Sequence, residues 1–364
     1  MRVAFYGSSL LSAYWNGAAT YYRGILSAIA AHGFETTFYE PDAFGRSAHR
    51  DIEPPDYARV TVYPADEASA AVVIAEAARA DVVVKASGVG VFDDLLLEGV
   101  MKAARPDALR IFWDVDAPAT LAEMAASPDH PLRRALPGLD LVLCYGGGDP
   151  VVSAYRAFGA KACIPIYNAL DPRSHHPAPR QARYAGDLVF MGNRLPDREA
   201  RVEEFFLRPA GMLPDRAFQI GGSGWHDKPM PPNVERLGHV PTAEHNAINS
   251  SALAVLNIAR DSMANTGFSP ATRVFEAAGA GACLITDYWE GIELFLEPGT
   301  EILVARDGEE VAAHLKALTP ERARRIGEAA RLRVLRDHSY EQRAILLDRV
   351  LRQAAAAKRE TVPA

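Results

Sequence analysis

Short apolar runs alternate with amphipathic stretches along almost the whole chain. The runs have the length of buried strands and lie at 3–6, 35–39, 82–85, 109–113, 141–144, 162–165, 187–191, 217–221, 253–257, 283–286 and 301–304. Stretches with helical periodicity separate them, for example at 18–32 and 93–104. Parallel strands buried on both faces are apolar throughout and need a crossover connection, usually a helix. The pattern therefore predicts an α/β fold built from doubly wound parallel sheets.

The alternation lapses once, at 168–184, where the chain is polar, punctuated by proline and without an apolar period. A chain of 364 residues is long enough for two domains. We therefore predict a first Rossmann-like domain at 1–170, a linker at 171–184 and a second Rossmann-like domain at 185–337. The remaining segment, 338–364, is a charged, amphipathic helical tail.

Composition excludes several classes of function. The 39 Lys and Arg residues against 46 Asp and Glu residues give a net charge of −7, without basic runs, so nucleic acid is not an expected partner. Cys144, Cys163 and Cys283 lie apart in apolar runs and are expected to be buried thiols in a reducing compartment, not zinc ligands. The start of the chain does not resemble a signal peptide, and no apolar run reaches membrane-spanning length. We expect a cytoplasmic protein that docks on no membrane surface.

The stretch 269–286 is the most informative for function, because only Arg273 and Glu276 carry charge there. Ser269 is a good N-cap and Pro270 suits the first position of a helix. The unpaired N–H groups and the positive dipole end of such a helix favour an anion such as a diphosphate. Glu276, three residues after Arg273, could then accept hydrogen bonds from a ribose diol. The alternative is an ordinary exposed ion pair on a surface helix.

Two further glycine turns end strands in the second half. In the turn at 192–194, Gly192 would let a ligand approach and Arg194 could reach a phosphate. Arg198 and Arg201 follow on the next helix and are interpreted as solvated charges. In the turn at 221–225, Trp225 could pack on a base or sugar ring, or the turn could be purely structural.

In the first half, no dinucleotide-type glycine pattern follows the first strand, which argues against hydride transfer. Asn16 and Gly17 could line a ligand site or form a plain turn. Asp114 and Asp116 form a DxD triplet after a strand. These carboxylates could hold a metal, serve a substrate hydroxyl with Asp116 as a base, or cap the following helix.

Three segments, 187–198, 269–287 and 338–343, resemble glycosyltransferases of GT-B architecture, and more closely the CgeB-like, spore-maturation-protein-like branch of the group-1 enzymes. The resemblance implies two Rossmann-like domains facing a cleft. The first would be the acceptor side, the second would bind the donor, and the last helix would return to the first domain. It further implies hexosyl transfer from a nucleotide-diphosphate sugar without a metal cofactor. An inverting enzyme would need a base such as Asp116, whereas a retaining one would not.

The same resemblance implies roles for individual residues. Glu276 would bind the ribose hydroxyls, Arg194 would stabilise the diphosphate as a catalytic residue, and the segment 234–240 would lie beside the base. At Phe268, many relatives place a second glutamate that holds the donor sugar, which leaves the sugar open here. The donor-side set is Gly192, Asn193, Ser269, Thr272, Arg273, Glu276, Gly222, Trp225, His239 and Val240, and the acceptor-side set is Asn16, Gly17 and Asp114.

Two other classes of protein remain open on the sequence. An epimerase acting on a sugar nucleotide would use the same architecture with acid and base groups gathered at the sugar. A non-catalytic module would bind the nucleotide sugar and transfer nothing.

Overall fold

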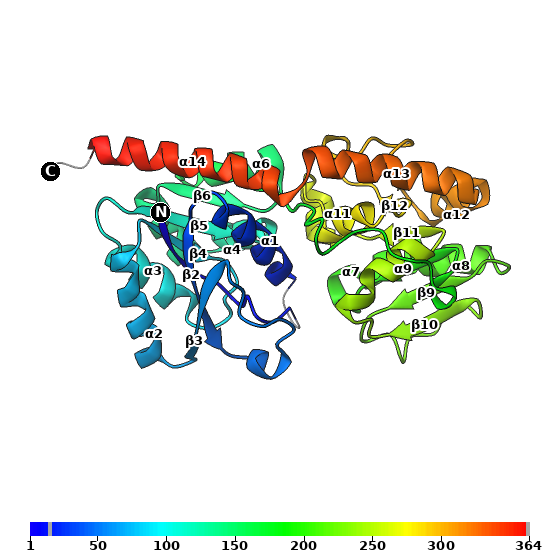
Figure 1. The fold of residues 1–364 in the computed structure, drawn as a ribbon, viewed down its shortest axis with the longest axis horizontal. Coiled ribbons are helices and arrows are strands. Elements are labelled where there is room, and N and C mark those ends of the chain that lie inside the picture. Colours follow the sequence, from blue (N-terminus) through cyan, green and yellow to red (C-terminus); the bar gives the residue numbers. More distant parts are fainter. Residues whose placement is uncertain (14–16, 362–364) are drawn as a thin grey trace. The chain divides into compact units, whose positions relative to one another are not determined.

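The computed structural model describes residues 1–13 and 17–361. The chain forms two compact units, the first made of Met1–Tyr167 with the segment that starts at Tyr340, and the second of Asn168–Ser339. Each unit is a parallel sheet flanked by helices (Figure 1). The predicted fold class, two doubly wound α/β domains, is confirmed. Among the described helices, none is both long and apolar enough to cross a membrane.

The sheet of the first unit has seven parallel strands in the order β3-β2-β1-β4-β5-β6-β7. Its strands are β1 (Arg2–Tyr6), β2 (Glu35–Asp42), β3 (Ala58–Pro64), β4 (Val82–Ala86), β5 (Leu109–Asp114), β6 (Leu141–Cys144) and β7 (Cys163–Pro165). Its helices are α1 (Ala18–Ala30), α2 (Glu67–Ala75), α3 (Asp93–Ala103), α4 (Ala117–Ala126), α5 (Pro131–Ala135), α6 (Gly148–Ala157) and α14 (Tyr340–Thr361).

The last helix, α14, lies against α1 in the first unit (Figure 1). The Tyr340 ring fills the space above Gly24, where a Cβ atom would be 2.1 Å from it. A buried stripe continues along the helix at Ala344, Leu347, Leu351 and Ala355. This spacing of three to four residues places all five side chains on one helix face, so the charged tail covers the first unit with its apolar side.

The sheet of the second unit has six parallel strands in the order β10-β9-β8-β11-β12-β13. Its strands are β8 (Leu188–Met191), β9 (Phe218–Gly221), β10 (Val234–Gly238), β11 (Ala254–Asn257), β12 (Leu284–Asp287) and β13 (Leu303–Ala305). Its helices are α7 (Pro196–Val202), α8 (Arg208–Met212), α9 (His245–Ser251), α10 (Asp261–Thr266), α11 (Thr272–Gly279), α12 (Gly308–Ala317) and α13 (Pro320–Asp337).

The segment predicted as a linker is hydrogen-bonded to the second unit. The backbone N–H groups of Ala178 and Gln181 donate to the hydroxyls of Ser250 and Ser251 on α9, at 3.1 and 2.9 Å. The N–H of Leu170 donates to the carbonyl of His338 at 2.8 Å. The chain therefore passes between the units at 167–168 and 339–340. Side-chain acceptors on another helix replace the regular backbone ladder here, and such bonds leave no periodic pattern in the sequence.

Candidate functional site

The helix that carries Arg273 and Glu276 begins later than predicted. Ala271 is the N-cap residue of α11, and no side chain caps the helix. Ser269 is buried and precedes the first helical residue by three positions, so its prediction as N-cap is wrong. The chain turns just before it, at Gly267 and Phe268, whose φ angles are +72° and +49°. Pro270 and Ala271 then lead into the helix, which starts at Thr272.

Arg273 and Glu276 do not form the exposed ion pair that the sequence leaves open. The Glu276 side chain is 12% exposed, and the Nε2 atom of His175 lies 3.9 Å from its Oε1 atom. Arg273 makes no hydrogen bond or ion pair with the described residues, and its Nη1 atom is shielded from solvent. Burial lowers the pKa of Arg273, and the charge of Glu276 opposes this shift. The Arg273 cation is therefore desolvated without a direct partner among the described residues.

A second guanidinium, that of Arg198 on α7, lies within electrostatic range of Arg273. Burial lowers the pKa of Arg198, and the positive charge of Arg273 lowers it further. Arg198 donates from Nη2 to the carbonyl of Asn193 at 2.6 Å and lies over the Phe190 ring, while its Nε is shielded and has no partner. Its interpretation as a solvated charge is wrong. The prediction for Arg201 is also wrong, because this residue pairs with the buried Asp287 at 2.6 Å.

Arg194 lies in a different set of contacts. Its guanidinium pairs with Glu199 at 2.8 Å and with Asp227 at 3.0 Å, which raises the pKa of Arg194. In return Arg194, followed by Lys228, lowers the pKa of Glu199 to about 2. No interaction of the described residues joins Arg194 to Glu276. Its role at a phosphate stays a prediction.

The two glycine turns predicted for the donor side pack on each other. Gly222 has a φ of +120°, and a Cβ atom there would be 2.3 Å from the carbonyl oxygen of Gly192. The Asn193 side chain accepts a hydrogen bond from the N–H of Ser223 at 2.9 Å. Trp225 is 3% exposed and donates from Nε1 to the Gly192 carbonyl at 2.7 Å. These contacts favour the structural interpretation of the turn and leave no free Trp225 face for a base.

Another histidine faces the charged cluster from α9. Burial lowers the pKa of His245, and the charge of Arg273 adds to this effect, whereas Glu276 and a hydrogen bond to the Val240 backbone oppose it. Val240 is buried, and His239 beside it is exposed. His245 thus links the segment predicted to lie beside the base with the segment that carries Glu276. The sequence suggests a solvated charge for Arg198 and no role for His175 or His245, because no short spacing connects these residues.

In the first unit, the predicted acceptor-side residues separate into different environments. Asp114 is fully buried and accepts hydrogen bonds from the Tyr155 hydroxyl at 2.5 Å, the Asp116 N–H at 2.9 Å and the Thr120 hydroxyl at 3.1 Å. Burial raises its pKa, and these hydrogen bonds oppose the shift. Asp116 is partly buried at the N-cap position of α4, without a side-chain cap bond. Gly17 is the exposed N-cap residue of α1, and Asn16 lies outside the described residues.

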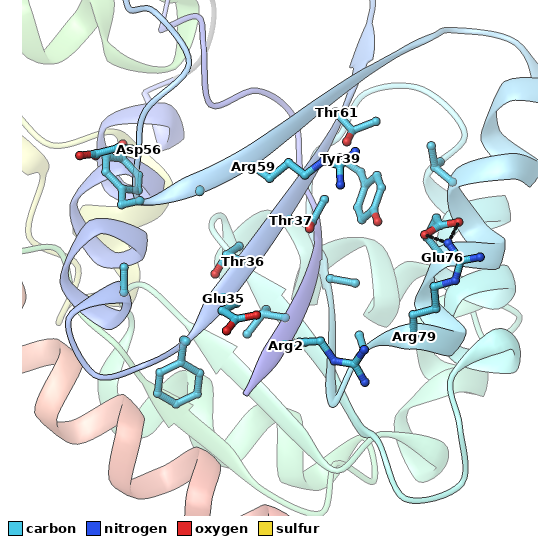
Figure 2. Close-up of a pocket in the computed structure, with 18 of the residues that line it drawn as sticks. Arg2, Glu35, Thr36, Thr37, Tyr39, Asp56, Arg59, Thr61, Glu76 and Arg79 are labelled. Atoms are coloured by element: carbon cyan, nitrogen blue, oxygen red, sulfur yellow. Dashed lines mark hydrogen bonds and ion pairs between the residues drawn. The ribbon is translucent and has the colours of Figure 1, made fainter.

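A groove of about 790 Å³ in the first unit lies elsewhere (Figure 2). Its lining includes Arg2, the first residue of β1, and Glu35, the first residue of β2. The ion-paired Glu76 and Arg79, which follow α2, also line it. Ligands of open α/β sheets bind at the carboxyl ends of the strands. The groove is therefore not the acceptor site predicted at Asp114, which ends β5.

Comparisons with known proteins agree with this architecture. Residues 198–348 match a family model described as glycosyl transferase-like. The chain is similar in structure to the sucrose-phosphate synthase from Thermosynechococcus elongatus, with a TM-score of 0.70, 14% identity and coverage of 98% of this chain and 100% of the other. It is also similar to HepE from Anabaena in complex with UDP and glucose, with a TM-score of 0.66, 13% identity and coverage of 97% and 100%.

A third similar structure is an alpha-glucosyltransferase in complex with UDP and a 13-mer DNA containing an HMU base. Its TM-score is 0.71 at 10% identity, with 97% of this chain and 99% of the other covered. No curated protein sequence matches the chain. The chain has two parallel sheets of seven and six strands and aligns with these structures over nearly its full length. Its fold is therefore the GT-B fold of glycosyltransferases. The glycosyl transferase-like match begins at Arg198 and includes Arg273 and Glu276.

Proposed function

We propose that the protein is a glycosyltransferase whose second unit binds a nucleotide-diphosphate sugar through Arg198, Arg273 and Glu276. The observation that carries the proposal is that the charged groups of this cluster are largely shielded from solvent and have atoms that lack a hydrogen-bond partner. Two neighbouring guanidinium groups each have a shielded donor atom without a partner, next to a carboxylate that accepts no hydrogen bond from the described residues. Buried cations are normally paired, so their direct partner is expected to be an anionic ligand.

The chemistry of sugar transfer suits such a cluster. Breaking the bond between sugar and diphosphate leaves negative charge on the phosphate oxygens, and preorganised cations stabilise that charge. A guanidinium can donate two parallel hydrogen bonds to phosphate. The Glu276 carboxylate can accept hydrogen bonds from ribose hydroxyls. Similar structures were solved in complex with UDP, which makes UDP and UDP-glucose the first probes for this chain.

The finer parts of the proposal concern the reaction. We infer a hydroxyl acceptor, transfer without a metal cofactor and retention of the anomeric configuration, on the resemblance to the group-1 enzymes and their CgeB-like branch. Asp116 is the candidate base should transfer prove inverting. Incubating the protein with UDP-glucose and analysing the products separates transfer or hydrolysis from epimerisation. Binding with no product under any acceptor would instead indicate a non-catalytic module.

Two arginine variants test the binding site. Arg198→Ala should weaken UDP binding about tenfold to a hundredfold in titration calorimetry, because a hydrogen bond to a charged group contributes about 1.5 to 3 kcal/mol. Arg194→Ala is the matched control from the adjoining turn, and it should change affinity less than about threefold because its partners are Glu199 and Asp227. A larger loss in Arg194→Ala than in Arg198→Ala would return the phosphate role to Arg194.

A further inference from the structure

His175 is held inside the second unit by contacts on both sides. Its backbone N–H donates to the carbonyl of Asp171 at 2.9 Å, and the segment around it is bound to α9 through Asn246, which accepts from His176 N–H at 3.3 Å and donates to Ser174 O at 2.9 Å. On the other side, a Cβ atom on Gly279 of α11 would be 3.0 Å from the His175 carbonyl oxygen. These contacts hold the backbone that carries the imidazole.

The imidazole lies beside the carboxylate that is proposed to bind ribose. Its side chain is 8% exposed, and Nε2 lies 3.9 Å from Oε1 of Glu276. This distance is too long for a hydrogen bond but short enough for electrostatic attraction when Nε2 carries a proton. The Nδ1 atom is buried without a partner. The Nε2 atom of His175 therefore lies close to the Glu276 carboxylate, whose oxygens accept no hydrogen bond from the described residues.

We propose that His175 is a positioning residue for Glu276, which orients the carboxylate toward the two hydroxyls of a ribose and so makes the site selective for ribonucleotides. The inference rests on the proposed function, since it assigns Glu276 to the sugar of the nucleotide. His245 and Arg273 also face Glu276, from α9 and from α11 itself. His175 differs from both in that it comes within ion-pair distance of the carboxylate.

The test compares UDP with 2′-deoxy-UDP by titration calorimetry. His175→Ala should weaken UDP binding about tenfold and 2′-deoxy-UDP binding by less, because the deoxynucleotide keeps only one of the two hydroxyls, so that discrimination between the two nucleotides falls. His175→Gln can place an amide N–H near the position of Nε2 and should retain most of the discrimination. In a Glu276→Gln background, His175→Ala should have little further effect, because the two residues act through one contact.

Three results would overturn the inference: unchanged UDP affinity in His175→Ala, an equal loss for both nucleotides, or losses that add to those of Glu276→Gln. Melting temperatures of all variants report folding, and His175→Leu, which fills the space of the ring without an N–H group, replaces His175→Ala if that variant does not fold. An equal loss of discrimination in His175→Gln and His175→Ala, with melting temperatures unchanged, would likewise count against the inference, because an N–H near the position of Nε2 would then not be what positions Glu276. If the wild-type protein binds none of UDP, ADP and GDP, the proposed function itself is wrong. If it binds UDP but the His175 variants behave in one of the ways above, only the inference about His175 is wrong.

Discussion

Gly192 sits where a side chain would collide with the proposed phosphate site. A Cβ atom there would be 2.7 Å from Nη2 of Arg198 and 3.0 Å from the Phe190 ring. The Arg198 guanidinium is the end of a flexible side chain, so it can move away at little cost to the fold. The absence of a side chain at this position therefore controls where Arg198 presents its donors.

We predict that Gly192→Ala weakens UDP binding by about fivefold or more, since displacing a guanidinium loses part of a charged hydrogen bond. Titration calorimetry measures the affinity and a thermal melt measures folding. Gly211→Ala, at a helical glycine with open space around it, is the control and should leave affinity unchanged. Normal affinity in Gly192→Ala would place the phosphate away from Arg198.

The pKa of His245 predicts a contribution to the pH dependence of stability. Burial lowers this pKa, so the folded protein takes up the proton at a lower pH than the unfolded chain, whose histidine pKa is about 6.5. The free energy of unfolding should fall as the pH drops from 6.5 through the pKa of the folded state, and His245 contributes no change above 6.5. His245→Gln should therefore lose less stability than the wild type between pH 7.5 and 5.

Denaturant unfolding at the two pH values measures this difference. His226→Gln is the control, because the His226 side chain is 88% exposed. An acid sensitivity that is the same in His245→Gln and in the wild type would mean that His245 is not buried in its neutral form.

At the scale of elements, α14 shows how a charged helix becomes part of a core. Leu347 on its buried stripe is fully covered, whereas Ile345 on the same helix is 50% exposed. Leu347→Ala should destabilise the first unit by about 2 to 5 kcal/mol, the usual cost of emptying a core position. Ile345→Ala should stay within about 0.5 kcal/mol. Equal effects of the two substitutions in denaturant unfolding would show that α14 is not packed along this stripe.

The strands differ in how well the sequence predicts them. Central strands such as β4 and β11 are buried along their whole length and are therefore mostly apolar, with Lys85 in β4 and Asn257 in β11 as the exceptions. The outermost strands β3 and β10 are not predicted from apolar runs, because most of their residues are only partly covered or exposed. Helix α11 is predicted as an element, but its first residue is not. The turn at Phe268 delays the helix, and backbone strain of this kind has no residue signature.

At the scale of the molecule, the two units differ in their chain path. The second unit is one continuous segment, Asn168–Ser339, with its own buried apolar cluster, whereas the first requires the returning α14. We predict that a fragment of residues 168–339 folds by itself and binds UDP, with a melting temperature that rises with UDP concentration. A fragment of residues 1–167 is the comparison and should be markedly less stable, because it lacks α14. An unfolded 168–339 fragment would contradict the division into units.

The sequence by itself determined the α/β class and most strands of both sheets, and it singled out Arg273 and Glu276 as candidate site residues. Strand burial and an isolated charge in an apolar run are local properties that composition and spacing express directly. Only the tertiary structure decided that Arg198 comes within electrostatic range of Arg273, and that His175 and His245 come within electrostatic range of Glu276. These groups come from α7, α9 and the segment before β8, far apart along the chain. Their proximity follows from how the elements pack around the sheet, which no local spacing of residues encodes.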